Sequence, residues 1–311
     1  GAGDHAAITL GQRGKIAQVG YLPFRVEKIV DAPAEYQVMI ADSHIKAPKS
    51  AAAKQQFNSR IASYNLGLAL LQQRCPETAH QIEHVRDLNP ERLGGGTSDI
   101  YRLLLKVPET MTRKDFENTL SSEYQQLMET NFSSHDDPGL YRVRGVLLFG
   151  AAECLRSKMA IDYLKQGDMA RFGELMKVSH DGDRVSRIGS DGEYVPWQAD
   201  GSETALRKLI SDLASEDPGR VLRAQLYMQP GSYACSTKEI DKMVDIACAV
   251  PGVAGAQIAG AGLGGCIMIL TQKDAVKAVR QALARGYYRP SGLTPTIVNC
   301  IMVEGARLAE F

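Results

Sequence analysis

Hydrophobic residues recur along this chain with two different spacings, and the change of spacing separates a strand-rich start from a helical middle. Short runs rich in β-branched residues, with turn residues between them, predict strands at residues 14–21, 24–30 and Tyr36–Asp42. We expect these strands to form an antiparallel sheet. From residue 51, apolar residues recur at steps of three and four, which predicts a long helix over Ala51–Arg74 that Pro76 ends.

Helical spacing dominates the next hundred residues. It predicts helices at residues 99–107, 113–120, 140–166, 169–178 and 203–214. The second of these follows a Thr112-x-x-Asp115 capping pattern, in which the two side chains satisfy backbone N–H groups of the first turn. The segment 187–230 differs in character, because it begins with glycine and charged residues around the only tryptophan, Trp197.

The last eighty residues alternate between strands and helices. Ser236-x-x-Glu239 predicts a capping box at the start of a helix that Pro251 and Gly252 end. Strands are then expected at residues 255–258, 266–270 and 296–303, with a helix at 274–284 before the last strand. This order predicts a split β-α-β arrangement, hence an α+β, ferredoxin-like layer of helices on an antiparallel sheet.

A glycine-rich turn, residues 260–265, lies between two of these strands. Glycine has no Cβ, so the backbone of such a turn lets a ligand approach closely, and successive N–H groups can form a site for an anion. The alternative is a hairpin that needs glycine only because its φ angles are positive. From the turn alone both interpretations stay open, since the spacing is that of neither a P-loop nor a dinucleotide fingerprint.

Composition narrows the class of partner. The 36 basic and 36 acidic residues cancel without forming a basic block, so electrostatics supports neither a nucleic-acid partner nor an anionic membrane surface. No apolar stretch approaches the ~20 residues of a membrane span. The six cysteines are scattered without Cys-x-x-Cys spacing, which favours reduced thiols in the cytoplasm. We therefore expect a cytoplasmic protein whose partner is a small molecule.

The segment from Ala249 to Cys266 closely resembles the last motif of galactokinases, within the GHMP kinase superfamily. The stretch from Cys235 to Val244 resembles the family's Cys-Pro-Glu-Leu-Asp-x-Leu-Val helix start, and Ser179-His180 resembles its Ser-His pair. At the other end, Gly1-Ala2-Gly3-Asp4-His5 resembles the Gly-x-Met-Asp-Gln segment. The resemblance covers nearly the whole chain except residues 187–230, which we interpret as an insertion.

This resemblance implies ATP-dependent phosphorylation of a free sugar at its anomeric hydroxyl, with Mg²⁺. Asp4 would be the catalytic aspartate, and Gly1, His5 and Phe57 would contact the sugar. On its own, an aspartate before an amphipathic stretch is more often a helix cap. The resemblance places the following residues near the nucleotide phosphates: Gly260, Ala261, Gly262, Leu263, Gly264 and Gly265.

Several positions depart from the galactokinase pattern. Gly3 replaces the methionine before the aspartate, and His5 replaces the glutamine after it. Phe57 stands where galactokinases carry a sugar-contacting tyrosine, in a Phe-Asn-x-Arg form similar to N-acetylgalactosamine kinases. Phe57 also begins the apolar stripe of its helix, so a purely structural role stays open. These departures leave the identity of the sugar undetermined.

The galactokinase motifs that precede the catalytic aspartate, a sugar-binding arginine and acidic cluster and a serine-rich phosphate loop, have no counterpart here. Residues 94–98, Gly-Gly-Gly-Thr-Ser, follow no strand and are interpreted as a linker. We therefore expect the C-terminal part of a sugar kinase, inactive without a missing N-terminal domain. Residues 1–48 would form a segment with the catalytic aspartate and strands, and residues 49–311 the GHMP kinase C-terminal domain.

Two other classes of function remain open. A non-catalytic galactokinase-like protein would bind sugar and nucleotide to regulate a partner, and the altered neighbours of Asp4 and the segment around Trp197 favour it. The other class is a ferredoxin-like binding module unrelated to kinases. Asp4 favours the kinase, and the length of the C-terminal resemblance disfavours the unrelated module.

Overall fold

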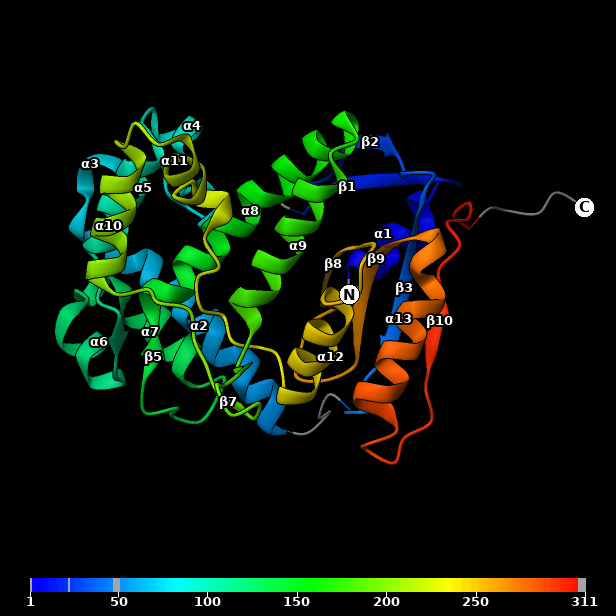
Figure 1. Cartoon of the computed structure of the whole chain (residues 1–311). Coiled ribbons are helices and arrows are strands. Elements are labelled where there is room, and N and C mark those ends of the chain that lie inside the picture. Colours follow the sequence, from blue (N-terminus) through cyan, green and yellow to red (C-terminus); the bar gives the residue numbers. More distant parts are fainter. Residues whose placement is uncertain (1, 22, 47–50, 307–311) are drawn as a thin grey trace, which may run out of the picture.

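The computed structural model describes residues 2–21, 23–46 and 51–306, in which a helical region lies beside a four-stranded sheet (Figure 1). The strands are β1 (Lys15–Tyr21), β2 (Phe24–Asp31), β3 (Tyr36–Asp42), β4 (Thr110–Met111), β5 (Tyr141–Arg142), β6 (Ser186–Ile188), β7 (Tyr194–Pro196), β8 (Val253–Ile258), β9 (Cys266–Gln272) and β10 (Ile297–Asn299). The helices are α1 (Ala2–Leu10), α2 (Ala51–Arg74), α3 (Pro76–Ala79), α4 (Pro90–Leu93), α5 (Thr97–Leu105), α6 (Arg113–Thr119), α7 (Gln125–Phe132), α8 (Val143–Gln166), α9 (Met169–Asp183), α10 (Glu203–Leu213), α11 (Pro218–Arg223), α12 (Lys238–Cys248) and α13 (Val276–Leu283).

The main sheet has the strand order β10-β3-β9-β8, and every neighbouring pair is antiparallel. Because β9 and β10 are both antiparallel to β3, which lies between them, they run in the same direction and are connected through α13. This is the predicted split β-α-β arrangement, and α12 and α13 lie together in front of the sheet (Figure 1). The α+β, ferredoxin-like fold is therefore confirmed.

The expectation that the first three strands share one sheet is wrong. β1 pairs with β2 in a separate two-stranded sheet, whereas β3 lies in the middle of the main sheet. The reason is burial, because Met39 and Ala41 of β3 are fully buried in the same hydrophobic cluster as Ile269 of β9. The division of the chain at residue 48 stays a prediction, although it would separate β3 from both strands it pairs with.

The apolar residues that follow the two spacings form separate cores. One joins α12 and α13 to the main sheet, where Met243 and Val279 pack with the buried residues of β3 and β9. The larger one joins α2, α5 and α8, with Leu66, Leu104 and Leu147 fully buried. Each fully buried side chain of this size contributes roughly 1.5–3 kcal/mol of transfer free energy, so these cores fix the helices and sheet that carry the site.

Two predicted caps have different outcomes. At α6, Thr112 accepts a hydrogen bond from the Asp115 N–H and Asp115 accepts one from the Thr112 N–H, which confirms the capping box. At α12, the predicted cap Ser236 is wrong. Thr237 caps the helix by accepting from the Ile240 N–H at 3.3 Å, because Ser236 is buried and its own N–H donates to Asp183.

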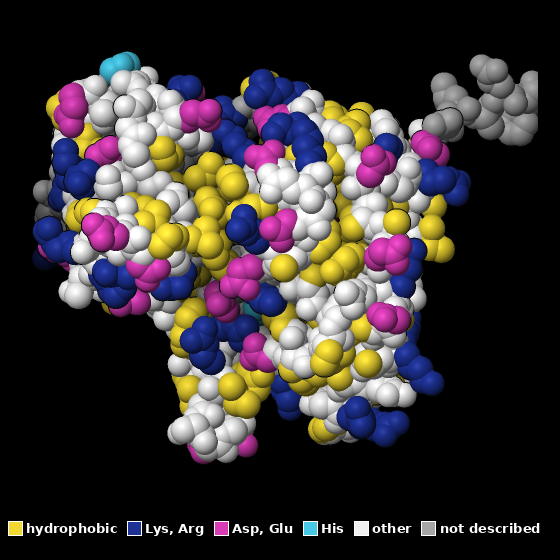
Figure 2. Space-filling view, turned by 45° about the horizontal axis from the view of Figure 1, so that its top comes forward, with side chains coloured by type: hydrophobic (Ala, Val, Ile, Leu, Met, Phe, Trp, Pro, Cys, Tyr) yellow, Lys and Arg dark blue, Asp and Glu magenta, His cyan; other side chains and the backbone are white. Residues whose placement is uncertain are grey.

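The predicted last strand, residues 296–303, is shorter in the structure, where pairing with β3 covers only β10. Lysine and arginine side chains alternate with aspartate and glutamate over the face in Figure 2, with no extended area of one sign. Within residues 2–21, 23–46 and 51–306, none of the helices combines the length and the hydropathy that crossing a membrane would require.

Candidate functional site

The predicted catalytic residue lies at the start of α1. Asp4 and His5 are exposed there, and the Thr9 hydroxyl donates to the His5 carbonyl within the same helix. The C-terminal segment holds the other end of α1, because the Gly305 N–H donates to the Gly11 carbonyl at 2.8 Å. Gly1, a predicted sugar contact, lies outside the described residues. The roles given to Asp4 and His5 stay predictions.

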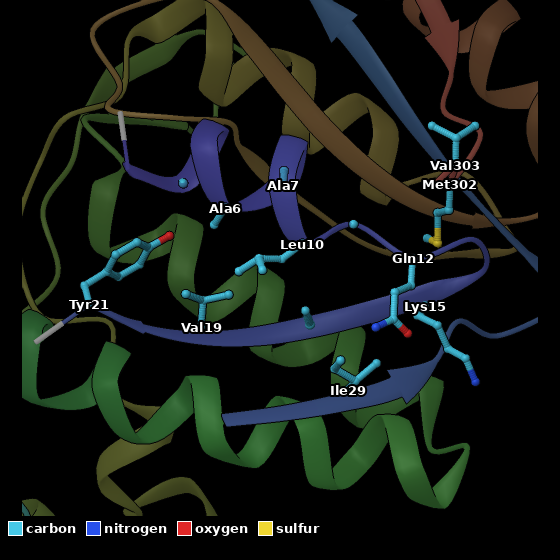
Figure 3. A pocket seen from close by; sticks show the side chains of 13 residues that line it. Ala6, Ala7, Leu10, Gln12, Lys15, Val19, Tyr21, Ile29, Met302 and Val303 are labelled. Atoms are coloured by element: carbon cyan, nitrogen blue, oxygen red, sulfur yellow. The ribbon is translucent and has the colours of Figure 1, made fainter. Parts of the chain in front are cut away.

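A cavity of about 370 Å³ lies beneath α1, lined by that helix, by β1 and β2, and by residues 302–303. In Figure 3, Leu10 of α1 lies over Val19 of β1, and the Tyr21 hydroxyl points toward the start of the helix. A Cβ atom at Gly3 would come within 3.2 Å of that hydroxyl. Tyr21 thus occupies the space that a side chain at residue 3 would need.

The glycine-rich loop, residues 260–265, connects β8 to β9 and is fastened by two distant segments. The Leu263 N–H donates to the Cys235 carbonyl at 2.6 Å, and the Gly265 N–H donates to the Ile45 carbonyl at 2.8 Å. In return, the Gly265 carbonyl accepts from the Ser43 N–H and hydroxyl. Part of this loop's backbone therefore serves the fold and is not available to a ligand.

The glycines of this loop fall into two kinds. All four have positive φ, which glycine adopts without steric cost. A Cβ atom at Gly262 would lie 2.2 Å from the Cys235 carbonyl oxygen, so close packing alone requires glycine there. At Gly260 and Gly265 a Cβ atom would meet nothing within 4 Å. The two interpretations of the turn are thus compatible, because one part is packed and the other is open to approach.

Phe57, the third predicted sugar contact, lies near the N-terminal end of α2 and is 39% exposed. One turn further along the helix, the Arg60 Nε donates to the Tyr233 carbonyl at 2.6 Å. Tyr233 stands two residues before Cys235, which holds the glycine-rich loop. The structure thus connects the start of α2 to the glycine-rich loop through residues 233–235.

A buried polar cluster, formed by His180, Asp183 and Asp241, lies near residues 233–235. His180 and Asp241 are both fully buried, with His180 Nε2 3.2 Å from Asp241 Oδ1. Burial raises the pKa of Asp241, but His180, Ser236 and the Val185 N–H outweigh it and hold that pKa below its usual value. Burial, with repulsion from Asp241, raises the pKa of Asp183 to about 7.

The sequence did not predict that Tyr21 and Arg142 lie near the candidate site. Tyr21 approaches Gly3 only because β1 folds back under α1, and Arg142 reaches residue 232 from the end of β5. Neither contact has a local signal, since the partners are 18 and 90 residues apart. The one available hint was Trp197, whose segment stood out in composition.

The family described as "GHMP kinases C terminal" matches residues 201–289, a region that begins inside the segment we interpreted as an insertion. The galactokinase of Roseiflexus sp. strain RS-1 is 32% identical over 278 residues, which are 89% of this chain and 48% of that relative. The galactokinase of Actinobacillus succinogenes is 36% identical over 88 residues, 28% of this chain and 23% of the relative.

Among solved structures, the chain resembles the Lactococcus lactis galactokinase determined in complex with galactose. The TM-score is 0.52 with 17% sequence identity, over 95% of this chain and 52% of that one. At this identity the likeness shows a shared fold. The chain thus spans about half the length of the solved relative, and less than half of each curated relative named above.

Proposed function

Because this chain belongs to the GHMP kinases and is galactokinase-like, we propose that it is the C-terminal part of an ATP-dependent sugar kinase. The substrate is a hexose or related sugar, phosphorylated at the anomeric hydroxyl. The observation that carries this proposal is the similarity to a galactokinase over 89% of the chain. It extends far beyond the glycine-rich loop.

In this proposal Asp4 acts on the sugar hydroxyl. A carboxylate beside a hydroxyl orients it and takes its proton as the oxygen attacks the transferring phosphoryl group. The exposed position of Asp4 in the first turn of α1 leaves it accessible to such a substrate. His5 and Phe57 are proposed to contact the sugar, and both side chains are also exposed.

The glycine-rich loop suits the nucleotide phosphates at its open part. A phosphate can approach the backbone at Gly260, where a Cβ atom would meet nothing within 4 Å. The Gly265 N–H is not available to it, because it donates to the Ile45 carbonyl. When bound, ATP supplies the phosphoryl group. Within the described part of the chain no group of three or more His, Cys, Asp or Glu side chains is arranged to hold a metal. Mg²⁺ in kinases is usually held by one or two carboxylates together with the phosphates of the nucleotide.

We further propose that the kinase is cytoplasmic and needs an N-terminal domain to complete the cleft. The chain alone would then be inactive. Large hydrophobic side chains are exposed on α1, β1 and β2, including Ile8, Tyr21, Phe24 and Ile29. A two-stranded sheet with apolar residues facing water is marginally stable by itself. A covering domain would remove this surface from water and position the substrates opposite Asp4.

The proposal is tested by expressing the complete reading frame and measuring ADP release from magnesium-ATP with a panel of free hexoses, N-acetylhexosamines and pentoses. Release that depends on one sugar class would support the kinase and identify its substrate class. Binding of sugar and nucleotide without ADP release, across the whole panel, would refute the kinase and favour the non-catalytic regulator.

A further inference from the structure

A second pocket, of about 420 Å³, lies beside the N-terminal half of α2. It is lined by the N-terminal half of α2, by Arg142 at the end of β5 and by residues at the β6–β7 hairpin, and Figure 1 shows β7 beside the lower end of α2. Its polar lining consists of Gln56, Arg60, Arg142, Trp197 and Gln198. No residue proposed to act in phosphoryl transfer lines it.

Two arginines, Arg60 and Arg142, line this pocket, and its lining contains no aspartate or glutamate. Arg60 Nε donates to the Tyr233 carbonyl, and Arg142 Nη1 lies 3.5 Å from the Ser232 hydroxyl. In the described part of the chain, neither guanidinium forms an ion pair with Asp or Glu within 4.0 Å. Burial and repulsion from Arg60 both lower the pKa of Arg142.

A guanidinium stays protonated in proteins, so this repulsion cannot be relieved by losing a proton. An anion placed between the two groups would relieve it. Arginine also presents its N–H groups as a planar fork, which matches the paired oxygens of a carboxylate or phosphate. The two arginines thus bring positive charge and N–H donors to a pocket whose lining contains no acidic side chain.

The hairpin wall of the pocket is fixed in place. Asp241 of α12 accepts hydrogen bonds from the backbone N–H groups of Val185 and Ser186. The backbone N–H of Trp197 donates to the Val185 carbonyl at 2.9 Å. The Arg187 guanidinium lies 4.3 Å from the centre of the Trp197 ring. The indole is therefore held at the pocket before any ligand arrives.

We propose that this pocket binds a small ligand through an oxyanion, a carboxylate or phosphate group held between Arg60 and Arg142. Its volume falls within the range typical of small-molecule sites, so it admits a ligand of monosaccharide size. The amides of Gln56 and Gln198 can bond further polar groups of that ligand. The inference does not rest on the proposed kinase activity.

Trp197 is the only tryptophan of the chain, so its fluorescence reports on this pocket. We would titrate the 311-residue chain with galacturonate, galactose 6-phosphate and neutral galactose. At least one anionic sugar should change the fluorescence saturably, and galactose should not. A response to galacturonate alone identifies a carboxylate ligand, and a response to galactose 6-phosphate alone identifies a phosphate ligand.

Arg142→Gln should raise the dissociation constant of the responding ligand about tenfold or more, since it removes one charged hydrogen-bond donor. Arg207→Gln is the matched control, because Arg207 is exposed on α10 and pairs with Glu203 of the same helix. It should leave binding unchanged. If Arg142→Gln does not fold by circular dichroism, Arg142→Lys, which keeps the charge and loses the fork, should weaken binding.

Three results would overturn the proposal. The first is that neither anionic sugar binds. The second is that galactose binds as tightly as the anionic sugars, which would mean that the pocket recognises the ring and not its charge. The third is that a folded variant at Arg142 binds the ligand like the wild type, which would place the anion elsewhere.

Discussion

Gly262 and Gly260 share a positive φ but differ in their surroundings, and this difference gives a prediction. Gly260→Ala should lower the free energy of unfolding by about 1 kcal/mol, the cost of a Cβ atom in the left-handed region. Gly262→Ala should cost roughly 3 kcal/mol or more, because its Cβ atom would also lie 2.2 Å from the Cys235 carbonyl oxygen. Urea denaturation of both variants measures the difference. Equal losses would show that the loop does not pack on residue 235.

These residues also show what the sequence could predict of the candidate site. The glycine content correctly indicated a tight turn beside a buried strand, because φ preference and missing Cβ atoms are local properties. Which glycines are packed and which are open depends on Cys235 and Ile45, which lie far away in the chain. The arginine pair was not predicted for the same reason, since Arg60 and Arg142 meet only after α2 packs on α8.

At the scale of elements, the β6–β7 hairpin depends on α12. Asp241 is fully buried and accepts hydrogen bonds from two N–H groups and the hydroxyl at Val185 and Ser186. Asp241→Asn replaces one acceptor oxygen by a donor, so we expect it to lower the free energy of unfolding by about 3 kcal/mol at pH 7. Asp274→Asn, at an exposed position, is the control and should change little.

The pH dependence of this loss follows from the lowered pKa of Asp241. A carboxyl whose pKa is lower in the folded state stabilises the fold above its unfolded pKa of about 3.9, and this stabilisation disappears as the pH falls through the folded pKa. The difference in unfolding free energy between wild type and Asp241→Asn should therefore shrink below about pH 4. A constant difference down to pH 3 would contradict this role of the charge.

Elements with a strong local signal were predicted well. The predicted limits of α2 agree with the structure at both ends, and β1, β2 and α10 agree to within one residue, because spacing, proline and capping residues act within a few positions. The pairing of β3 was not predicted, because its partners come more than 220 residues later in the chain. The cap of α12 was misplaced by one residue, since Ser236 and Thr237 are equally suitable caps and burial decides between them.

At the scale of the whole molecule, the chain combines a complete ferredoxin-like sheet with an exposed apolar surface. The main sheet is covered by α12 and α13 on one face and contacts α8 and α9 through the cluster of Leu164, Met176 and Leu270 on the other. The exposed residues of α1, β1 and β2 have no such cover within the described chain. Because Asp4 lies in the first turn of α1, the proposed catalytic residue lies beside this surface.

The most direct test of the account is the turnover of the complete protein with Asp4→Asn, using the sugar that supports ADP release. Turnover should fall by about 10²-fold or more while the dissociation constant of the sugar stays within about threefold, since asparagine keeps the shape but cannot take a proton. Asp31→Asn, an exposed aspartate of β2 that pairs with Lys15, is the control and should retain full turnover. Unchanged turnover of Asp4→Asn would remove Asp4 from the mechanism and contradict the central claim.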